Sequence, residues 1–380
     1  MVKTVGYFIF ALFYNISRLF PVDESRVLCI MTHDDGEDGN VSLVVRELKK
    51  RNMGYSFSCI TKSETEAVKS FKDMGKLMAF FFVRPYQMAR AGIILMDNVF
   101  LPMAYIRLRS NVKVVQLWHG TGTIKRFGQD ANTGRLKALE KRANRSITHL
   151  IVNSEQTARI YAQAFGIDAS RIYPMGLPKT DDILNRIRRL EINKKNMEKD
   201  AVYGRYRIPG DKKLILYAPT FRDENLGSDI TIRQVKELAE LLPRDYILGL
   251  RLHPFVAGMA KKLEMDNICD LSGEKSLSEL IMASDILITD YSSIIFEYCL
   301  TQKPMIFFAY DLDEFEKHGR GFYRDYTAYV PGPVARTAKE VADIINRGEY
   351  SNELIRAFNA INFPVLDGEA TMRIIDLIIS

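Results

Sequence analysis

Polar side chains follow several predicted strands of this chain, at the point where each strand ends. His119 and Gly120 come directly after an apolar run that closes with the single tryptophan, and Thr121 follows them. Histidine is the side chain whose ordinary pKa best suits proton transfer near neutral pH. A strand-end histidine before a turn-forming glycine therefore predicts a general base. The alternative is a histidine that only bonds its own loop.

Two further groups at predicted strand ends have side chains that suit phosphate. Thr220 and Arg222 follow one strand, and a hydroxyl and a planar guanidinium both bind phosphate oxygens. Arg251 and His253 close another strand, and strand alternation places them on the same side. A basic pair at a strand end suits a diphosphate. For Arg222, the alternative is a surface ion pair with Asp223.

A fourth group follows the predicted strand 286–289. Asp290 comes first, and Ser292 and Ser293 then fall at the predicted start of a helix. Hydroxyls and free backbone N–H groups at a helix N-terminus bind anions. Glu297 lies about one turn further, where its carboxylate could accept hydroxyls from a ribose. A plain N-cap is the alternative for the two serines.

The elements that position these residues alternate between short apolar runs and helical patterns. Such alternation predicts βαβ units, hence an α/β fold with two doubly wound parallel-sheet domains and a cleft between them. Ligands of such sheets bind at the carboxyl ends of the strands. The predicted strands are 26–31, 55–60, 93–96, 114–118, 149–152, 214–219, 246–251, 286–289 and 305–308. The predicted helices include one capped by Asn40 and Ser42, and 231–241, 276–283, 292–301 and 370–379.

Composition shifts divide the chain into five segments. The predicted order is an apolar membrane-associating segment (1–22), an N-terminal domain (23–180), a basic linker (181–213), a C-terminal domain (214–362) and a final helix (363–380).

The N-terminal segment and the charge distribution both favour contact with an anionic membrane surface. Arg18 is the only charged residue in 5–20, and sixteen residues are too few to span a bilayer as a helix. The segment therefore predicts a helix in the membrane interface, with a helix packed on the domain core as the alternative. Residues 1–180 hold 26 Lys and Arg against 15 Asp and Glu, whereas 181–380 hold 27 against 32. An uneven spread of solvated helix faces would explain the same asymmetry.

Several protein classes are disfavoured by what the sequence lacks. It has no GxGxxG after a strand, no GxxxxGK[ST], no HExxH and no GxSxG. The four cysteines are widely spaced, which favours free thiols in a reducing cytosol over a metal clip. No cofactor is expected to be required; a divalent cation such as Mg²⁺ is the open alternative, although the sequence shows no ligand cluster for one. Nucleic acid is not an expected partner, because aromatic residues do not interleave with the basic clusters.

Taken together, these motifs resemble those of the CDP-glycerol/CDP-ribitol polyolphosphotransferases of wall teichoic acid and related polymer synthesis. The resemblance spans about 85–330 and rests on QLWHGT, VNS, GLPKTD, YAPTFRD, RLHP, SDILITDYSSIIFEY and KPMIFF. It implies a GT-B-type fold. It also implies transfer of glycerol phosphate from CDP-glycerol, or ribitol phosphate from CDP-ribitol, to a hydroxyl of a lipid-diphosphate-linked saccharide acceptor such as an undecaprenyl diphosphate, with release of CMP. The chain is similar in length to the glycerophosphate primase members, which add the first glycerol phosphate. The resemblance also implies a peripheral enzyme on the cytoplasmic face of the cell membrane.

The resemblance also implies roles for the residues above. His119 would be the base, and His253 would stabilise charge on the donor phosphates as a second catalytic residue. The implied donor site holds Thr220, Arg222, Arg251, Asp290, Ser292, Ser293 and Glu297, and the implied acceptor site holds His33, Gly120, Thr121 and Lys125. Family members usually read HGTPLKK where this chain reads HGTGTIK, which leaves the acceptor open. A GT-B glycosyltransferase or sugar-nucleotide epimerase, and a membrane scaffold with a decayed nucleotide fold, are the competing hypotheses.

Overall fold

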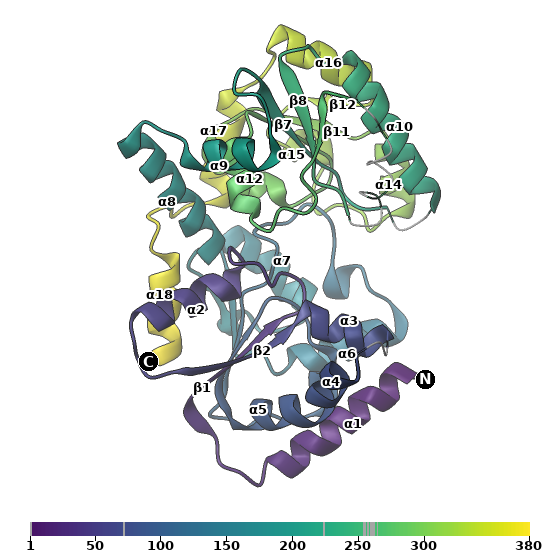
Figure 1. Ribbon diagram of the computed structural model, residues 1–380. Coiled ribbons are helices and arrows are strands. Elements are labelled where there is room, and N and C mark those ends of the chain that lie inside the picture. Colours follow the sequence, from purple (N-terminus) through teal and green to yellow (C-terminus); the bar gives the residue numbers. More distant parts are fainter. Residues whose placement is uncertain are drawn as a thin grey trace. The chain divides into compact units, whose positions relative to one another are not determined.

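The computed structural model describes residues 2–70, 73–222, 225–253, 256, 258, 263 and 265–380, which form two compact units (Figure 1). The first unit comprises Met1–Thr121, Arg126–Asp181 and Val365–Ser380, and the second comprises Gly122–Lys125 and Asp182–Pro364. Each unit contains one six-stranded sheet in which every paired strand is parallel. The predicted α/β class with two doubly wound parallel sheets is confirmed.

The sheet of the first unit has the order β2-β1-β3-β4-β5-β6. Its strands are β1 (Asp23–Met31), β2 (Ser56–Thr61), β3 (Ala91–Met96), β4 (Lys113–Gln116), β5 (His149–Val152) and β6 (Ile172–Pro174). Its helices are α1 (Val2–Ser17), α2 (Asn40–Lys50), α3 (Lys62–Ser70), α4 (Met74–Met78), α5 (Arg84–Arg90), α6 (Gly134–Asn144), α7 (Glu155–Phe165) and α18 (Ala370–Ile379). A π-helix, η1 (Ala79–Val83), joins α4 to α5, and η2 (Leu101–Tyr105), η3 (Gly128–Asp130) and η4 (Ala169–Arg171) are 3₁₀ turns.

The sheet of the second unit has the order β12-β11-β10-β7-β8-β9. Its strands are β7 (Lys213–Ala218), β8 (Tyr246–Leu250), β9 (Ile268–Asp270), β10 (Ile286–Thr289), β11 (Met305–Phe308) and β12 (Val334–Ala335). Its helices are α9 (Met197–Tyr206), α10 (Asn225–Leu241), α12 (Leu277–Ala283), α13 (Ile294–Tyr298), α14 (Leu312–His318), α15 (Tyr326–Tyr329), α16 (Ala338–Arg347) and α17 (Asn352–Asn362), with the 3₁₀ turn η5 (Cys299–Thr301). Helix α8 (Pro178–Asn193) begins in the first unit and continues into the second.

Both sheets are buried on their two faces, which explains the continuous apolar runs in the sequence. In β1, Leu28 and Ile30 pack with α1 and α5, whereas Val27 and Cys29 pack with α2 and α18. Alternate residues of a strand point to opposite faces, so a strand covered on both sides needs apolar residues at every position. The core of each sheet therefore has two layers.

Each sheet has one point where the strand order reverses. This switch point lies between β1 and β3 in the first unit and between β7 and β10 in the second. Neighbouring loops leave the sheet in opposite directions there, so a crevice opens at the carboxyl ends of the two strands. The predicted chemistry-bearing residues follow these strands or their neighbours.

Three segments lie elsewhere than the predicted boundaries place them. The 181–213 stretch, expected as a linker, contains most of α8 and all of α9, and its residues from 182 onward belong to the second unit. Residues 122–125 also belong to the second unit. The final helix α18 belongs to the first unit, where Ile374, Ile375 and Ile378 are buried. Each compact unit is therefore built from segments that are not contiguous in the sequence.

Helix α1 packs on the core of the first unit with one face and leaves the other face exposed, while its contact with a membrane stays a prediction. Phe10 and Tyr14 are buried in the core of the first unit, and the Phe10 ring lies 5.4 Å from that of Phe80. On the opposite face, Phe8 and Leu12 are each 58% exposed. No helix in the described part of the chain is long and apolar enough to cross a membrane.

Candidate functional site

A buried aspartate organises the switch point of the first unit. Asp97 directly follows β3, and its side-chain carboxylate accepts hydrogen bonds from three backbone N–H groups of the loop after β1. The donors are Thr32 at 3.0 Å, His33 at 3.2 Å and Asp34 at 2.7 Å. Three consecutive donors on one carboxylate fix this loop over the end of β3. Burial nevertheless raises the pKa of Asp97 to about 6.

The same aspartate fixes the tautomer of the predicted base. His119 Nδ1 lies 2.9 Å from the backbone oxygen of Asp97. A carbonyl oxygen can only accept, so Nδ1 carries the proton and Nε2 of the neutral ring keeps a free lone pair. Burial, with the neighbouring His33 as the next cause, lowers the pKa of His119 to about 3. His119 is therefore neutral at physiological pH, with Nε2 unprotonated, and its role as a base stays a prediction.

His33 lies directly against His119. The two imidazole rings stack with their centroids 3.6 Å apart and an interplanar angle of 6°. Burial and the charge of Lys179 lower the pKa of His33 to about 4. The stack brings a predicted acceptor residue and the predicted base into one centre. Two neutral rings can pack in this way, whereas two imidazolium ions would repel each other.

A set of hydrogen bonds ties the loop after β4 to this centre. Trp118 has a φ of +50°, a strained conformation for a non-glycine residue. Its backbone oxygen accepts from Asn40 Nδ2 at 2.8 Å, and its N–H donates to Gln116 Oε1 at 2.9 Å. Asn40 Oδ1 also accepts from the Lys179 N–H at 3.0 Å, and the Lys179 ammonium pairs with Asp34 at 2.5 Å. Loops after β1, β4 and β6 are thereby joined.

Asn40 was expected to cap a helix, and this prediction is wrong. Helix α2 does begin at Asn40, but its N-cap is Gly39 and no side chain caps it. The Asn40 side-chain amide instead donates to the backbone oxygen of Trp118, in the loop after β4. Gly120 and Thr121, predicted to touch the acceptor, lie in that loop. Thr121 is buried, and the Gly120 oxygen accepts from the Tyr161 hydroxyl at 2.7 Å.

The two buried histidines predict a stability loss in mild acid. The unfolded chain takes up their protons below pH about 6.5, whereas the folded protein does so only near pH 4 and 3. Stability should therefore fall as pH drops from about 6.5 to 4, by up to about 2.7 kcal/mol per pH unit for the pair. Asp97 opposes this between pH 6 and 4, because its folded form binds the proton more tightly. Urea unfolding of wild type and of a His33→Asn/His119→Asn variant at several pH values measures the difference, and parallel pH profiles would contradict it.

The switch point of the second unit repeats the arrangement of the first. Asp290 directly follows β10 and is buried, with 1% of its surface exposed. Its Oδ1 accepts from the N–H groups of Thr220 at 2.7 Å and of Tyr291 at 2.5 Å. Its Oδ2 lies 2.8 Å from Arg222 Nη2. An aspartate after one central strand thus holds the loop after the other, as Asp97 does.

Arg222 is fully engaged by its own loop cluster. Its Nε and Nη2 donate to the two carboxylate oxygens of Asp311 at 2.7 and 2.9 Å, and its Nη1 donates to the Thr220 oxygen at 2.5 Å. Although burial opposes the charge, Asp290 and Asp311 raise the pKa of Arg222 above its ordinary value. A phosphate would have to compete with two carboxylates for this guanidinium. The geometry therefore gives Arg222 a positioning role, and direct phosphate contact stays a prediction.

The basic pair after β8 lies beside this cluster. Arg251 Nη1 donates to the backbone oxygen of Glu274 at 2.8 Å. The exposed His253 ring stacks on the Phe221 ring, with the two centroids 4.0 Å apart. His253 and Phe221 line a small hollow with Thr220, Arg222 and Leu252. The structure therefore brings Thr220, Arg222 and His253 together. Asp223 and Pro254, which flank these motifs, lie outside the described residues.

The predicted helix over 292–301 is shorter than expected. Helix α13 covers five residues, Ile294–Tyr298, so its dipole adds little to anion binding. Ser292 Oγ accepts from the Ile294 N–H at 3.4 Å, and Ser293 is the N-cap without a side-chain cap bond. Glu297 is buried, with 5% of its surface exposed. Direct contacts of these side chains with a donor stay predictions.

Lys125, predicted to touch the acceptor, contacts a predicted donor residue, and its contact with an acceptor stays a prediction. It belongs to the second unit, where it forms an antiparallel bridge with Phe322, and its Nζ lies 3.3 Å from Thr220 Oγ1. Burial, partly offset by Asp290, lowers the pKa of Lys125 to about 8. Gly122 allows the segment 122–125 to pass close to Phe296, because a Cβ at this position would lie 2.2 Å from the Phe296 ring.

Sequence reasoning missed two residues that organise the two centres, Asp97 and Asp311, and it gave Asn40 the wrong role. Asp97 directly follows the predicted strand 93–96, so a systematic reading of strand ends would have found it. Asp311 lies three residues after β11, and nothing in the sequence marks its pairing with Arg222. Among the described residues, no group of three or more His, Cys, Asp or Glu side chains could hold a metal ion.

Comparison with known proteins gives matches along nearly the whole chain. Residues 12–380 match the family model for CDP-glycerol:poly(glycerophosphate) glycerophosphotransferase. The chain is 34% identical over 373 residues to the teichoic acid poly(ribitol-phosphate) polymerase of Bacillus spizizenii, which covers 96% of this chain and 58% of that protein. It is 29% identical to the teichoic acid glycerol-phosphate primase of Bacillus subtilis, covering 98% of this chain and 96% of the primase. The chain thus spans little more than half of that polymerase and nearly all of that primase.

Solved structures give the same picture at the level of the fold. The wall teichoic acid polymerase TagF matches with a TM-score of 0.78 at 25% identity, over 99% of this chain and 94% of that one. A histidine-to-asparagine variant of TagF soaked with CDPG also matches, with a TM-score of 0.78. The UDP-GlcNAc 2-epimerase of Neisseria meningitidis matches with a TM-score of 0.61 at 13% identity, over 93% of this chain and 99% of that one. This last likeness extends to the fold alone.

Proposed function

Because the chain belongs to the CDP-glycerol:poly(glycerophosphate) glycerophosphotransferase family, we propose that it transfers glycerol phosphate from CDP-glycerol to a hydroxyl of a lipid-diphosphate-linked saccharide. The observation that carries the proposal is the fixed tautomer of His119. Its Nδ1–H donates to the backbone oxygen of Asp97, which leaves Nε2 free to take a proton. A base of this kind is what attack by an acceptor hydroxyl requires.

In the proposed reaction, His119 Nε2 takes the proton of the acceptor hydroxyl while that oxygen attacks the β-phosphorus of CDP-glycerol. The bond from the β-phosphorus to the bridging oxygen breaks, and CMP leaves with that oxygen. The anionic phosphates would raise the low pKa of His119 as the proton arrives. Donor charge would be stabilised by His253, Lys125 and the hydroxyls of the serines after β10, in loops held by Asp290.

A product analysis tests the proposal. The purified protein is incubated with a lipid-linked disaccharide and either CDP-glycerol or CDP-ribitol, with Mg²⁺ or with EDTA. We expect CMP release and a product heavier by one or more glycerol phosphate groups, in EDTA as well as in Mg²⁺. Activity that disappears in EDTA and returns with Mg²⁺ would contradict the proposal that no resident metal is needed. Absence of CMP release with both donors would overturn the transferase itself.

Ribitol phosphate is the second candidate for the transferred group. It is supported by the 34% identity to a poly(ribitol-phosphate) polymerase. Faster CMP release from CDP-ribitol than from CDP-glycerol would replace the first proposal by this one. Whether one unit or many are added follows from the product mass in the same assay.

Lys125 offers a test of the donor site that is specific to this structure. Its buried ammonium lies beside Thr220 without a carboxylate within ion-pair distance among the described residues. We expect Lys125→Met to raise the KM for the CDP donor by roughly tenfold or more and to leave the acceptor KM unchanged, since a charged hydrogen bond contributes about 1.5–3 kcal/mol. Initial rates with each substrate varied in turn give both constants. A rise in the acceptor KM alone would return Lys125 to the acceptor.

We also propose that the enzyme binds the cytoplasmic face of the membrane through the exposed side of α1. Replacing Phe8 and Leu12 by serine should weaken binding to vesicles of anionic phosphatidylglycerol by roughly tenfold or more, because each buried side chain contributes about 1.5–3 kcal/mol. Leu354→Ser/Ile361→Ser, on the exposed face of α17, is the matched control. Vesicle sedimentation at low and high salt measures the affinity. Equal binding by the α1 variant and the control would refute the role of α1.

A further inference from the structure

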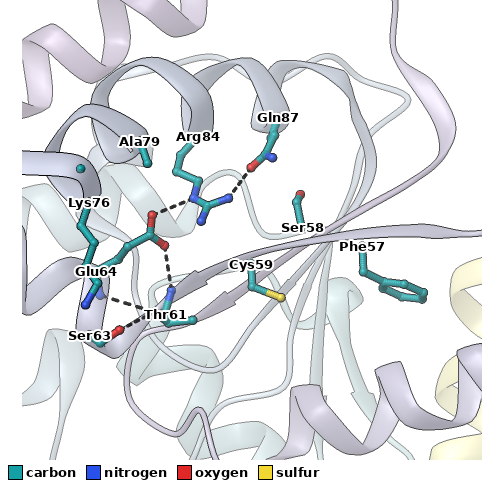
Figure 2. A pocket seen from close by; sticks show the side chains of 11 residues that line it. Phe57, Ser58, Cys59, Thr61, Ser63, Glu64, Lys76, Ala79, Arg84 and Gln87 are labelled. Atoms are coloured by element: carbon teal, nitrogen blue, oxygen red, sulfur yellow. Dashed lines mark hydrogen bonds and ion pairs between the residues drawn. The ribbon is translucent and has the colours of Figure 1, made fainter.

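We propose that a pocket in the first unit, beside the edge strand β2, binds a saccharide unit of the acceptor. The inference rests on the proposed function only for the identity of that acceptor. The pocket has a volume of about 540 Å³, within the usual range for small-ligand sites. Its lining comes from β2, the start of α3, α4, η1 and α5, all within the first unit (Figure 2).

A fixed polar chain crosses this pocket. Arg84 Nε lies 2.9 Å from Glu64 Oε1, and Arg84 Nη1 donates to Gln87 Oε1 at 2.8 Å (Figure 2). The second Glu64 oxygen accepts from the Thr61 N–H at 3.4 Å, while Thr61 Oγ1 accepts from the Glu64 N–H at 3.4 Å. This reciprocal capping box locks the carboxylate at the start of α3. The pocket therefore presents a carboxylate, a guanidinium and an amide in fixed positions.

The chemistry of the lining suits a ligand rich in hydroxyls. Ser58, Thr61 and Ser63 add three hydroxyl groups to the polar chain. Glu64 offsets the charge of Arg84, and the other cation of the lining, Lys76, lies 3.7 Å from Asp73. Each cation thus has a carboxylate partner and attracts an anion less than a lone arginine or lysine would. Paired donors and acceptors that are held rigidly match the neighbouring hydroxyls of a sugar ring. The lining therefore favours a neutral saccharide over a phosphate.

The pocket and the loop that carries His33 follow neighbouring strands of the same sheet, β2 and β1. Thr61, at its edge, pairs in register with Met31 of β1, two residues before His33. The charge of Lys62 is among the causes that lower the pKa of His33. Both loops leave the carboxyl edge of the same sheet. A sugar bound beside Thr61 would thus have its neighbouring unit near the base.

Exposed apolar side chains lie on the helical segment that borders the pocket. Lys76 of α4 and Ala79 of η1 line the pocket, while Met78 and Phe82 of the same continuous segment are 51% and 42% exposed. The Phe82 ring packs on Phe13 of α1, with centroids 4.3 Å apart. The π-helical turn of η1 itself is a feature that is frequent at functional sites. A hydroxylated pocket beside an apolar stripe fits a sugar that is carried on a lipid.

Cys59 lines the pocket and supplies a readout that does not depend on catalysis. Its hydrogen bond with Cys29, with Arg84 as a further cause, lowers the pKa of Cys59 to about 7. Cys269, a partly exposed thiol in the second unit, has a pKa raised to about 11 by burial and serves as the internal control. Alkylation of each cysteine by iodoacetamide is followed by peptide mass analysis while chitobiose, glycerol 3-phosphate or inorganic phosphate is added.

We expect chitobiose to slow alkylation of Cys59 in a saturable manner, by roughly tenfold at about ten times its Kd, and to leave Cys269 unchanged. Gln87→Ala should abolish this protection and raise the acceptor KM without changing the donor KM. Gln163→Ala, an exposed glutamine on α7, is the matched control and should behave as wild type. Equal thermal unfolding of the three proteins confirms that they are folded.

Three results would overturn the proposal. They are no protection by chitobiose at any concentration, protection by phosphate or glycerol 3-phosphate as strong as that by chitobiose, or protection that survives Gln87→Ala. The test is separate from the transferase assay. Protection without CMP release would leave the saccharide pocket standing while the proposed transfer fails, and CMP release without protection would do the reverse.

Discussion

Replacing His119 by asparagine is expected to lower kcat for transfer from CDP-glycerol by about 10²–10⁴-fold, the usual contribution of a general base. In the wild type, the backbone oxygen of Asp97 lies 2.9 Å from His119 Nδ1. The asparagine side chain can still donate an N–H to this oxygen, so the loop should keep its shape. It offers no group that can take the acceptor proton. Because the loss lies in the chemical step, the KM for the donor should change little.

His149 provides the matched control. It lies on β5 of the same unit, with Nδ1 2.8 Å from the Thr148 hydroxyl, and is not part of the loop cluster. His149→Asn should retain kcat within a few-fold. Steady-state rates and thermal unfolding of both variants separate catalysis from folding. A His119→Asn protein that is folded and transfers at near wild-type rate would refute the assignment of the base.

The second large effect is expected at Asp290. Its replacement by alanine removes the acceptor of two backbone N–H groups and one of the two carboxylates around Arg222. Loss of one partner from a buried ion pair typically destabilises a protein by about 3–5 kcal/mol. The loop that carries Thr220 would lose its anchor as well, so donor binding should weaken together with stability.

Asp313→Ala is the control for Asp290→Ala. Asp313 pairs with Arg336 at 3.4 Å on the surface, with 77% of its side chain exposed. An exposed pair contributes about 0–1 kcal/mol, so this variant should unfold close to the wild type. Urea denaturation gives both free energies. Similar values for the two aspartates would show that the Asp290 cluster does not organise the donor loops.

The strands that flank the two centres could be predicted because they are buried on both faces. Apolar runs such as 149–152 and 286–289 coincide with β5 and β10 to the residue. Of the four edge strands, only the six-residue β2 was predicted. The other three, β6, β9 and β12, were not, because two or three residues carry no hydrophobic pattern. Prediction thus succeeded where burial imposes a pattern on the sequence.

The candidate sites could be predicted only as far as strand ends reveal them. His119, Asp290 and Thr220 follow predicted strands and lie at or beside the switch points. The tautomer of His119 depends on a backbone oxygen, and the pairing of Arg222 with Asp311 joins residues 89 positions apart. Such contacts leave no local trace in the sequence. The membership of Lys125 in the second unit could not be predicted for the same reason, because it depends on the bridge to Phe322.

Helix α18 has a consequence for how the protein is made. The Asp181 carboxylate holds the start of α18 in the first unit. It accepts hydrogen bonds from the backbone N–H groups of Ala370 at 3.2 Å and Thr371 at 2.6 Å. On a ribosome, N-terminal domains usually fold first. Here the first unit cannot be completed until α18 is synthesised, after the second unit. Until then, the face of β1 and β3 that α18 covers stays open, and a nascent chain would be most exposed to chaperones and proteases at that face.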